Sequence, residues 1–344
     1  MRKSNTRFQM SLSLVFLLSL GLVGTSKAEI TFETLVEQVK LNEAKYKNID
    51  LKIDYIYQSG PASIRPVTTS ATNVKIFATS QDSIRYVTQE GRYRVEVESD
   101  NLFQDGSSRK SNHIKMYDGK LTRLLEQDHI VNLIQGYAGD NYLIRPHMLF
   151  LRGPYFYMPF LTLLSGDKAI AASPDANWSP ENSLEYAYQG EADFNGLKCH
   201  QIWATLHKNK KPVRRLEFWL AADRNFIPAR YCSYQLKLSE DQPTVEGEVS
   251  GWIEVSPGIW FPKEMKTTSF SPYLLKRGQK VVQWTKKYQT KEVSLTPRHE
   301  LSFFQNLEIP DGALVYEIEN QKIIKSYKKG SASDPESADA PVDP

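Results

Sequence analysis

The second half of the chain is dominated by long segments in which apolar and polar residues alternate. Short connections rich in turn residues join them: HKNKKP, ADRNF, SEDQP, SPG and PYLLKRG. An alternation of period two is typical of strands with one buried face, and connections of this length form hairpins. A sheet of this size does not stay flat, so the sequence predicts a curled or partly closed barrel. The predicted strands span 197–206, 213–221, 227–238, 245–255, 259–270 and 281–295.

The first half has one amphipathic helix followed by shorter strand-like runs. Thr34 and Glu37 have the spacing of a capping box, and the apolar residues around them predict a helix over 32–45. From Ile49 to Tyr57 the period changes to two, and Gly-containing turns separate several of the later runs, as in an antiparallel meander. The strands predicted in this half span 49–57, 73–78, 83–88, 92–98, 113–118 and 120–125.

The two ends of the chain differ from the body. A basic start, an apolar stretch from Met10 to Val23 and the small residues Ser26 and Ala28 predict an export signal at 1–28, cleaved after Ala28. The exported chain is expected in the periplasm or outside the cell. Residues 29–330 are predicted to form a single domain, and the Ser, Ala, Asp and Pro-rich segment 331–344 is predicted to be a disordered acidic tail.

The net charge of +3 argues against a nucleic-acid partner, because proteins that bind nucleic acids show a much larger excess of basic residues. Four basic residues belong to the signal, and the remaining 39 basic and 40 acidic residues give −1. The acidic tail accounts for −4 of this, so the body has a charge of +3. A mildly basic body favours weak peripheral contact with an anionic membrane.

The motifs of common enzymes are absent from the sequence. There is no G-x-S-x-G, phosphate-binding loop, dinucleotide fingerprint, H-E-x-x-H or C-x-x-C pattern, and no two of the six histidines have the spacing of metal ligands. The sequence therefore predicts no metal site, no cofactor and no enzyme. Carboxylates on predicted strands keep a hydrolase of envelope polymers as an alternative, although the solvent face of a strand explains them equally well. They are Glu217, Glu246, Glu248 and Glu254.

Cys199 and Cys232 leave two alternatives open. An exported protein is in a compartment where disulfides form. In a simple meander, however, the two residues lie on strands separated by a third strand, ~9–10 Å apart, which is beyond bridging distance. A bulge or another strand order would bring them together.

The segment 142–165 is apolar, has no acidic residue and is interrupted by Pro146, Pro154 and Pro159. Prolines divide such a segment into short helices or turns. An ordinary core helix would explain its composition, but a concave sheet needs a cover, and Met and aromatic side chains suit a lid over an apolar cavity. The lid residues expected to contact a ligand are Met148, Leu149, Phe150, Phe156, Met158, Phe160 and Leu163.

This order of elements resembles the LolA-like superfamily of bacterial lipoprotein carriers and related envelope proteins. The resemblance covers residues 30–328 and includes the YDGK turn at Tyr117–Lys120, the segments LEFWLAADRNFIPARYCSY and GWIEVSPGIWFPKEMKTTSF, and the ending LEIPDGALVYEIENQKIIKSY. It implies an unclosed antiparallel β-barrel, or half-barrel, with an N-terminal helix and a helical lid, whose apolar concave face binds lipid or acyl chains.

Three functions follow from this interpretation. The first is a non-enzymatic protein that binds lipid or the acyl chains of lipoproteins. The second is an envelope sensor or scaffold module with a protein partner, and the third is the hydrolase. For the first function, the candidate residues of the cavity wall are Trp203, Phe218, Leu220, Trp252 and Trp260.

Overall fold

The structure of the protein is a computed structural model that describes residues 30–63, 77–126, 129–136, 144–151, 160–164 and 182–331. The predicted signal peptide and all but the first residue of the predicted tail lie outside these ranges. None of the helices in the described ranges has the length and apolar composition of a membrane-spanning helix.

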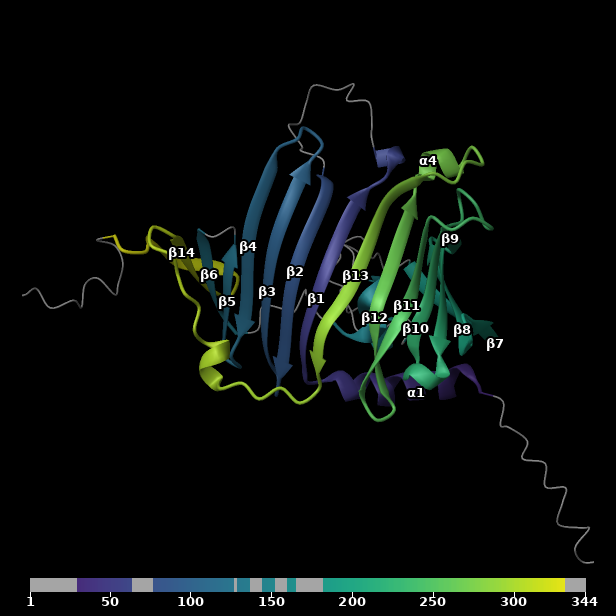
Figure 1. Ribbon diagram of the computed structural model, residues 1–344, viewed down its shortest axis with the longest axis horizontal. Coiled ribbons are helices and arrows are strands. Elements are labelled where there is room, and N and C mark those ends of the chain that lie inside the picture. Colours follow the sequence, from purple (N-terminus) through teal and green to yellow (C-terminus); the bar gives the residue numbers. More distant parts are fainter. Residues whose placement is uncertain are drawn as a thin grey trace, which may run out of the picture.

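The described strands form one sheet of 15 strands that does not close on itself, with β15 at one edge and β7 at the other (Figure 1). The predicted fold class, a mainly β half-barrel with an N-terminal helix, is confirmed. The strands are β1 (Ile49–Ser59), β2 (Phe77–Gln89), β3 (Arg92–Phe103), β4 (Ser108–Tyr117), β5 (Leu121–Glu126), β6 (Ile130–Gln135), β7 (Asn182–Phe194), β8 (Leu197–Lys208), β9 (Lys211–Ala221), β10 (Ile227–Gln235), β11 (Val245–Ser256), β12 (Ile259–Phe270), β13 (Val282–Ser294), β14 (Leu314–Glu319) and β15 (Lys322–Lys328).

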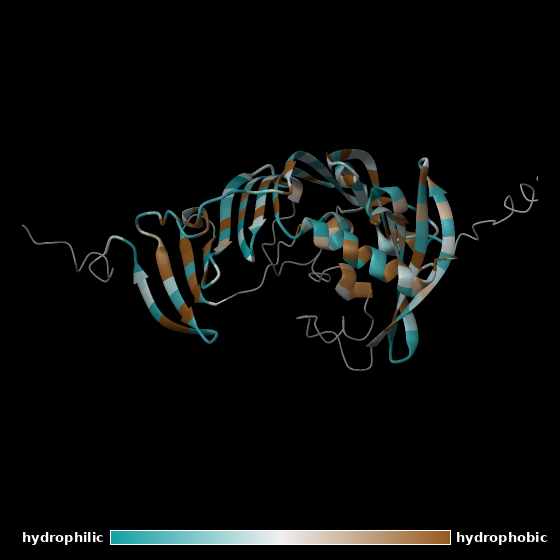
Figure 2. Cartoon of the chain, turned by 90° about the horizontal axis from the view of Figure 1, so that it is seen from below, coloured by the Kyte–Doolittle hydropathy of each residue, from teal (hydrophilic) through white to brown (hydrophobic). Residues whose placement is uncertain are grey.

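Two antiparallel meanders meet at the centre of this sheet. Strands β1 to β6 follow one another on one side and β7 to β13 on the other, and β1 pairs with β13. The chain then crosses back, and β14 pairs in parallel with β6. Because strands twist, a sheet of this width curves, and Figure 2 shows it as an arch with helices beneath one half.

The helices are short. They are α1 (Phe32–Glu43), α2 (Phe160–Leu164), α4 (Pro272–Leu275) and the 3₁₀ turns η1 (Ala44–Tyr46), η2 (Pro61–Ser63), η3 (Pro146–Leu151), η4 (Ala222–Arg224) and η5 (Leu301–Phe304). The helix predicted over 32–45 is found as α1 and η1. Its N-cap is Thr31, whose hydroxyl accepts the N–H of Thr34 at 3.3 Å, rather than Thr34 itself. Leu35 and Val39 are fully buried on its inner face.

The strands differ from the prediction mainly in the first half of the chain. The two predicted strands 73–78 and 83–88 were wrong as separate elements, because one continuous strand, β2, begins at Phe77. Residues 73–76 lie outside the described ranges. The strands β6, β7, β14 and β15 were not predicted.

The segment between β13 and β14 runs along the convex face of the sheet. Arg94 Nη1 donates to the carbonyl of Phe303 at 2.8 Å, and the Arg94 and Arg85 guanidinium groups lie 4.9 and 5.2 Å from the centre of the Phe303 ring. Phe304 is fully buried beside it. These contacts hold η5 against the convex side of β2 and β3.

Candidate functional site

The concave face of the half-barrel is apolar along β8 and β9. Ile202 and Ala204 on β8 and Leu216, Phe218 and Leu220 on β9 alternate along their strands, and each is at most 1% exposed. They belong to one cluster that extends through Tyr231, Val249, Phe261, Met265 and Tyr288 on the neighbouring strands. This cluster is the largest core of the described chain.

The predicted lid covers this face. We call its two described pieces, η3 and α2 with the preceding residues Ile144 and Arg145, the lid. Met148, Leu149 and Phe150 are between 2 and 8% exposed, and Phe160 and Leu163 are fully buried. All five are part of the same cluster as the strand residues. Phe156 and Met158 lie outside the described ranges. The lid side chains therefore fill the apolar end of the concave face.

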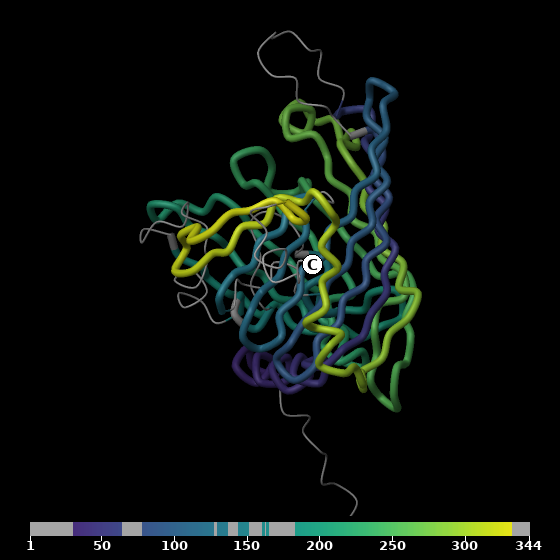
Figure 3. Tube along the Cα trace, turned by 90° about the vertical axis from the view of Figure 1, so that its left-hand side faces the viewer, coloured from purple at the N-terminus to yellow at the C-terminus, as the bar shows by residue number. Residues whose placement is uncertain are grey.

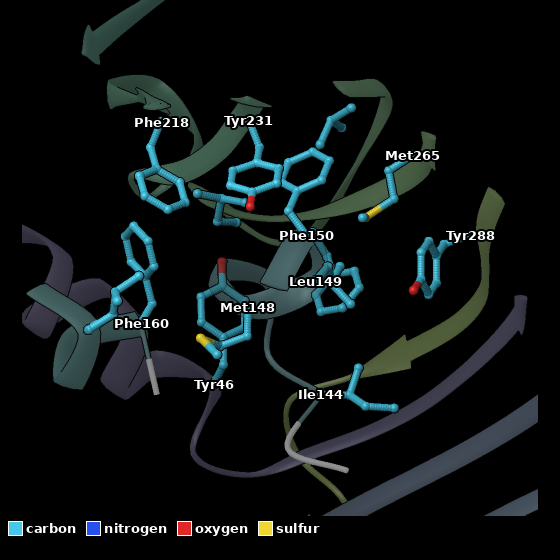
Figure 4. Packing of buried hydrophobic residues seen from close by; sticks show 14 of the residues in the cluster. Tyr46, Ile144, Met148, Leu149, Phe150, Phe160, Phe218, Tyr231, Met265 and Tyr288 are labelled. Carbon is cyan, nitrogen blue, oxygen red and sulfur yellow. The ribbon is translucent and has the colours of Figure 1, made fainter. Parts of the chain in front are cut away.

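Aromatic contacts join the lid to the strands (Figure 4). The Phe160 ring meets Phe218 edge to face, with ring centres 5.1 Å apart. The Phe150 ring stacks on Tyr231 at 6.1 Å. Phe150 also lies directly over Gly247 of β11, where a Cβ atom would be 2.7 Å from its Cδ1. Only glycine at this position lets the lid sit so close to the sheet.

Few polar contacts attach the lid. Glu43 of α1 accepts the N–H of Leu161 at 3.2 Å, and its other oxygen lies 4.0 Å from Arg145. The Tyr186 hydroxyl donates to the carbonyl of Leu163. Burial is the largest influence on Glu43 and raises the pKa of its carboxyl, against the opposing effect of Arg145. A single buried carboxyl thus contacts both pieces of the lid.

Asn225 connects the lid to the rest of the fold. It follows η4 in the left-handed conformation, with φ of 56°. Its Nδ2 donates to the carbonyl of Gly258 at 2.9 Å and to Asn42 Oδ1 at 3.2 Å, and its Oδ1 accepts the N–H of Trp260 at 2.7 Å. Its carbonyl lies 2.9 Å from His147 Nε2 in the lid. Asn225 is therefore a junction of α1, η3 and two hairpins.

His147 is a buried histidine in the lid, and burial lowers its pKa to about 4. Arg145 acts in the same direction, whereas the hydrogen bond to Asn225 opposes it. The neutral ring donates its Nε2 hydrogen to Asn225, and an unfolded histidine ionises near pH 6.5. The unfolded chain therefore takes up the proton first as the pH falls.

We expect acid to destabilise the protein through His147. Because its folded pKa of about 4 lies below the unfolded value, stability is lost as the pH falls from about 6.5 toward 4, by roughly 2 kcal/mol at pH 5. Urea unfolding of the wild type and of His147→Gln at pH 7.5 and pH 5 measures this. The variant keeps an N–H donor and should show a smaller loss. An equal loss in both proteins would assign the acid sensitivity to other groups.

The far end of the concave face is more polar. Along β1, Ile49, Leu51 and Ile53 are at most 1% exposed, whereas Tyr55 and Tyr57 are half-buried. Across from them on β13 the Lys286 Nζ lies 4.9 Å from the centre of the Trp284 ring and 5.9 Å from that of Tyr55. The end of the concave face remote from α1 thus has a cationic group beside aromatic rings.

Two of the predicted wall residues do not line this face. Trp203 points to the convex side, opposite its buried neighbours Ile202 and Ala204, and the Arg215 guanidinium lies 4.5 Å from its ring centre. Trp260 lies on the opposite side of β12 from Phe261, and the Arg224 guanidinium lies 3.9 Å from its ring centre.

The other three predicted wall residues contact the cluster on the concave face. Phe218 and Leu220 are fully buried in the cluster under the lid. Trp252 is half-buried and contacts both this cluster and a small convex one, next to a bulge in β11. That small cluster is formed by Cys199, Ala221 and Ala229.

The cysteines are free and buried, so the disulfide between Cys199 and Cys232 is not formed. Cys199 pairs across to Ala221 of β9, and Cys232 pairs to Glu217 on the other side of the same strand. The simple meander is therefore the correct alternative. Burial raises the pKa of the Cys199 thiol to about 12 and that of Cys232 to about 11, so neither is an activated nucleophile.

The strand carboxylates lie on the convex side, and Glu217, Glu246 and Glu254 have partners there. Glu217, expected to face solvent, is 4% exposed, binds Arg215 at 2.8 Å and accepts from the Tyr234 hydroxyl at 3.3 Å. Glu246 pairs with Lys280 at 3.1 Å, and Glu254 accepts the N–H of Gly258 at 2.7 Å. Among the described residues, no three His, Cys, Asp or Glu side chains are placed to hold a metal ion.

The chain is similar to several solved structures. One is a DUF1329 family protein from Desulfovibrio piger, with 12% identity over 79% of this chain and 96% of the other and a TM-score of 0.39. Another is a putative outer membrane lipoprotein-sorting protein domain from Vibrio parahaemolyticus, with 10% identity, coverage of 80% and 98% and a TM-score of 0.40. A third is a LolA superfamily protein from Nitrosomonas europaea, with 8% identity, coverage of 80% and 97% and a TM-score of 0.35.

These similarities are distant and concern the fold alone. The resemblance to LolA-like proteins stated from the sequence is found again among the structural neighbours. No protein-family model matches the chain, and no curated protein matches its sequence.

Several residues of the site were not predicted. Ile202 precedes the predicted Trp203 on the opposite face of β8, and Leu216 lies two residues before the predicted Phe218 on the same face of β9, so the alternation along each strand was the available signal. Asn225 had a weaker signal, since an Asn at the end of a tight turn often adopts the left-handed conformation. Glu43 had none, because only the folded chain brings α1 to the start of α2.

Proposed function

We propose that this protein binds the acyl chains of a lipid or a lipoprotein in the bacterial cell envelope, and that it does so without catalysing a reaction. The observation that carries the proposal is the nature of the lid. Its apolar side chains occupy the concave face and, within the described ranges, belong to a 3₁₀ helix of 6 residues and an α-helix of 5 residues.

A ligand could take the place of the side chains of such short pieces on the concave face. An acyl chain that replaced Phe150 and Phe160 would bury its own methylene groups against the same wall, at ~0.8 kcal/mol for each. The polar end of the concave face, with Lys286 between aromatic rings, would receive the head of an amphiphile. With the export signal that the sequence predicts, this binding would occur in the periplasm or outside the cell.

Native mass spectrometry of the protein, purified from lysate that retains its membranes, tests the proposal. We expect a fraction of the protein to carry an additional mass that organic extraction releases as an acyl lipid. A protein that is always free of lipid, and that also fails to bind a fluorescent fatty acid, would contradict it.

A substitution beneath the lid sharpens the test. In Gly247→Ala the new Cβ would meet the Phe150 ring at 2.7 Å, so Phe150 must move and the lid should open more often. We expect several-fold tighter binding of the fluorescent fatty acid. Gly251→Ala on the same strand is the matched control, because its Cβ would meet no atom closer than 3.5 Å. Equal binding by both variants and the wild type would show that the lid does not guard the site.

A further inference from the structure

The hairpin of β14 and β15 forms one free edge of the sheet. Within the described strands, β15 pairs with β14 alone, and the two are joined by a tight turn at Asn320 and Gln321, both with positive φ. The hairpin lies at the end of the molecule remote from β7 and projects from the sheet (Figures 1 and 3). We call it the edge hairpin.

The edge hairpin exposes two large apolar side chains. Ile323, which pairs with Ile318, is 61% exposed, and Ile324, the extra residue of a bulge in β15, is 60% exposed. Beside Ile324 is a hollow of about 350 Å³, lined by Leu121, Leu133 and Ile318 together with Gln135, Glu317 and Glu319. Two large exposed aliphatic residues in succession on a free edge are unusual for a protein surface.

The charges of the edge hairpin are segregated. The outer strand and its end carry Lys322, Lys325, Lys328 and Lys329 with no acidic residue, and the acids Glu317 and Glu319 are on the inner strand β14. Lys325 lies 4.0 Å from Glu317, and the Lys322 and Lys328 side chains are exposed. The free edge therefore combines exposed isoleucines with a row of positive charges.

We propose that the edge hairpin docks on the surface of an anionic lipid bilayer. Isoleucine side chains enter the boundary between head groups and acyl chains, and lysines contact anionic head groups. The edge hairpin therefore matches both the apolar layer and the negative charge of such a membrane surface. A second copy of the chain fits less well. Antiparallel pairing of two β15 strands about their centre would place Lys325 opposite Lys325 and Lys322 opposite Lys328.

Vesicle flotation tests this proposal with the whole exported chain. Vesicles of phosphatidylcholine alone are compared with vesicles that contain about 30% phosphatidylglycerol, at low and at high salt. We expect binding to the anionic vesicles only, weakened by salt. The variant with Ile323→Ser and Ile324→Ser should bind roughly tenfold more weakly. Lys322→Gln with Lys328→Gln should reduce both the binding and its salt dependence.

Leu41→Ser with Tyr273→Ser is the matched control, because these residues are 60 and 62% exposed but lie on α1 and α4. Its binding should stay within about twofold of the wild type. Equal weakening in the control and in the isoleucine variant, or no binding of the wild type to anionic vesicles, would overturn the proposal. So would a wild type that binds no vesicle but forms dimers through this edge.

This docking is independent of the acyl-chain site. The isoleucine variant should still carry the lipid mass seen by native mass spectrometry, since its substitutions lie outside the cluster under the lid. Loss of vesicle binding with retained lipid would support the proposal. Removal of residues 332–344, which follow the edge hairpin and contain four acidic residues, should strengthen binding to anionic vesicles.

Discussion

Asn225→Ala is expected to destabilise the protein by roughly 3–5 kcal/mol, enough to unfold much of it at physiological temperature. Asn225 is 7% exposed and makes four side-chain hydrogen bonds, to Asn42, Tyr46, Gly258 and Trp260. Alanine would leave these groups buried without their partner, at about 1 kcal/mol for each. Alanine is also disfavoured at the φ of 56° that this position requires.

Two further variants separate these contributions. Asn225→Gly tolerates the positive φ but loses the same hydrogen bonds, so it should recover roughly 1 kcal/mol relative to alanine. Asn209→Ala is the matched control, because Asn209 has a φ of 51° on an exposed turn, and its loss should be about 1 kcal/mol. Urea unfolding measures all three. Similar losses for Asn209→Ala and Asn225→Ala would show that backbone conformation alone matters and that the junction contributes nothing.

The fold could be predicted from the sequence where strands are long and half-buried. In β9, Leu216, Phe218 and Leu220 alternate with residues of the convex face, and the pattern predicts both the strand and its buried side. The polar centre of β2 misled the prediction. Ser80 and Asp82 were taken as part of a break between two strands, but within β2 the Ser80 hydroxyl donates to Asp82 at 2.9 Å.

The placement of the candidate site residues could be predicted in part, and their contact with a ligand stays a prediction. The segment 142–165 was predicted as a lid from its composition, and its described residues are buried on the concave face. Trp203 was predicted as a wall residue, but the small Ala204 and the aliphatic Ile202 on either side are the ones buried on the concave face. On the convex side, the ring of Trp203 is instead stabilised by a cation–π contact with the Arg215 guanidinium. Alternation, not size, is the better guide to which residues line a wall.

Phe160→Ala and Phe218→Ala are expected to have opposite effects on ligand binding, although the two rings form one contact with centres 5.1 Å apart. Each ring is fully buried, and truncating such a ring costs about 3–5 kcal/mol when the surroundings do not collapse. Phe160 belongs to the lid and Phe218 to the sheet. The first truncation should therefore weaken the closed lid, whereas the second should weaken the wall in both the closed and the open state.

The consequence for binding follows from the share of molecules with an open lid. If a fatty acid binds only when the lid is open, its apparent dissociation constant is the intrinsic constant divided by that share. Loss of about 3 kcal/mol from the closed state raises a rare open state by up to roughly 100-fold, so Phe160→Ala should bind a fluorescent fatty acid far more tightly than the wild type. Phe218→Ala should bind it more weakly and unfold at lower urea, because its cavity lies in the wall that the ligand contacts.

Titration of both variants with the fluorescent fatty acid, with urea unfolding alongside, distinguishes a lid from a core. If the segment is an ordinary part of the core, both truncations lower stability alike and neither improves binding.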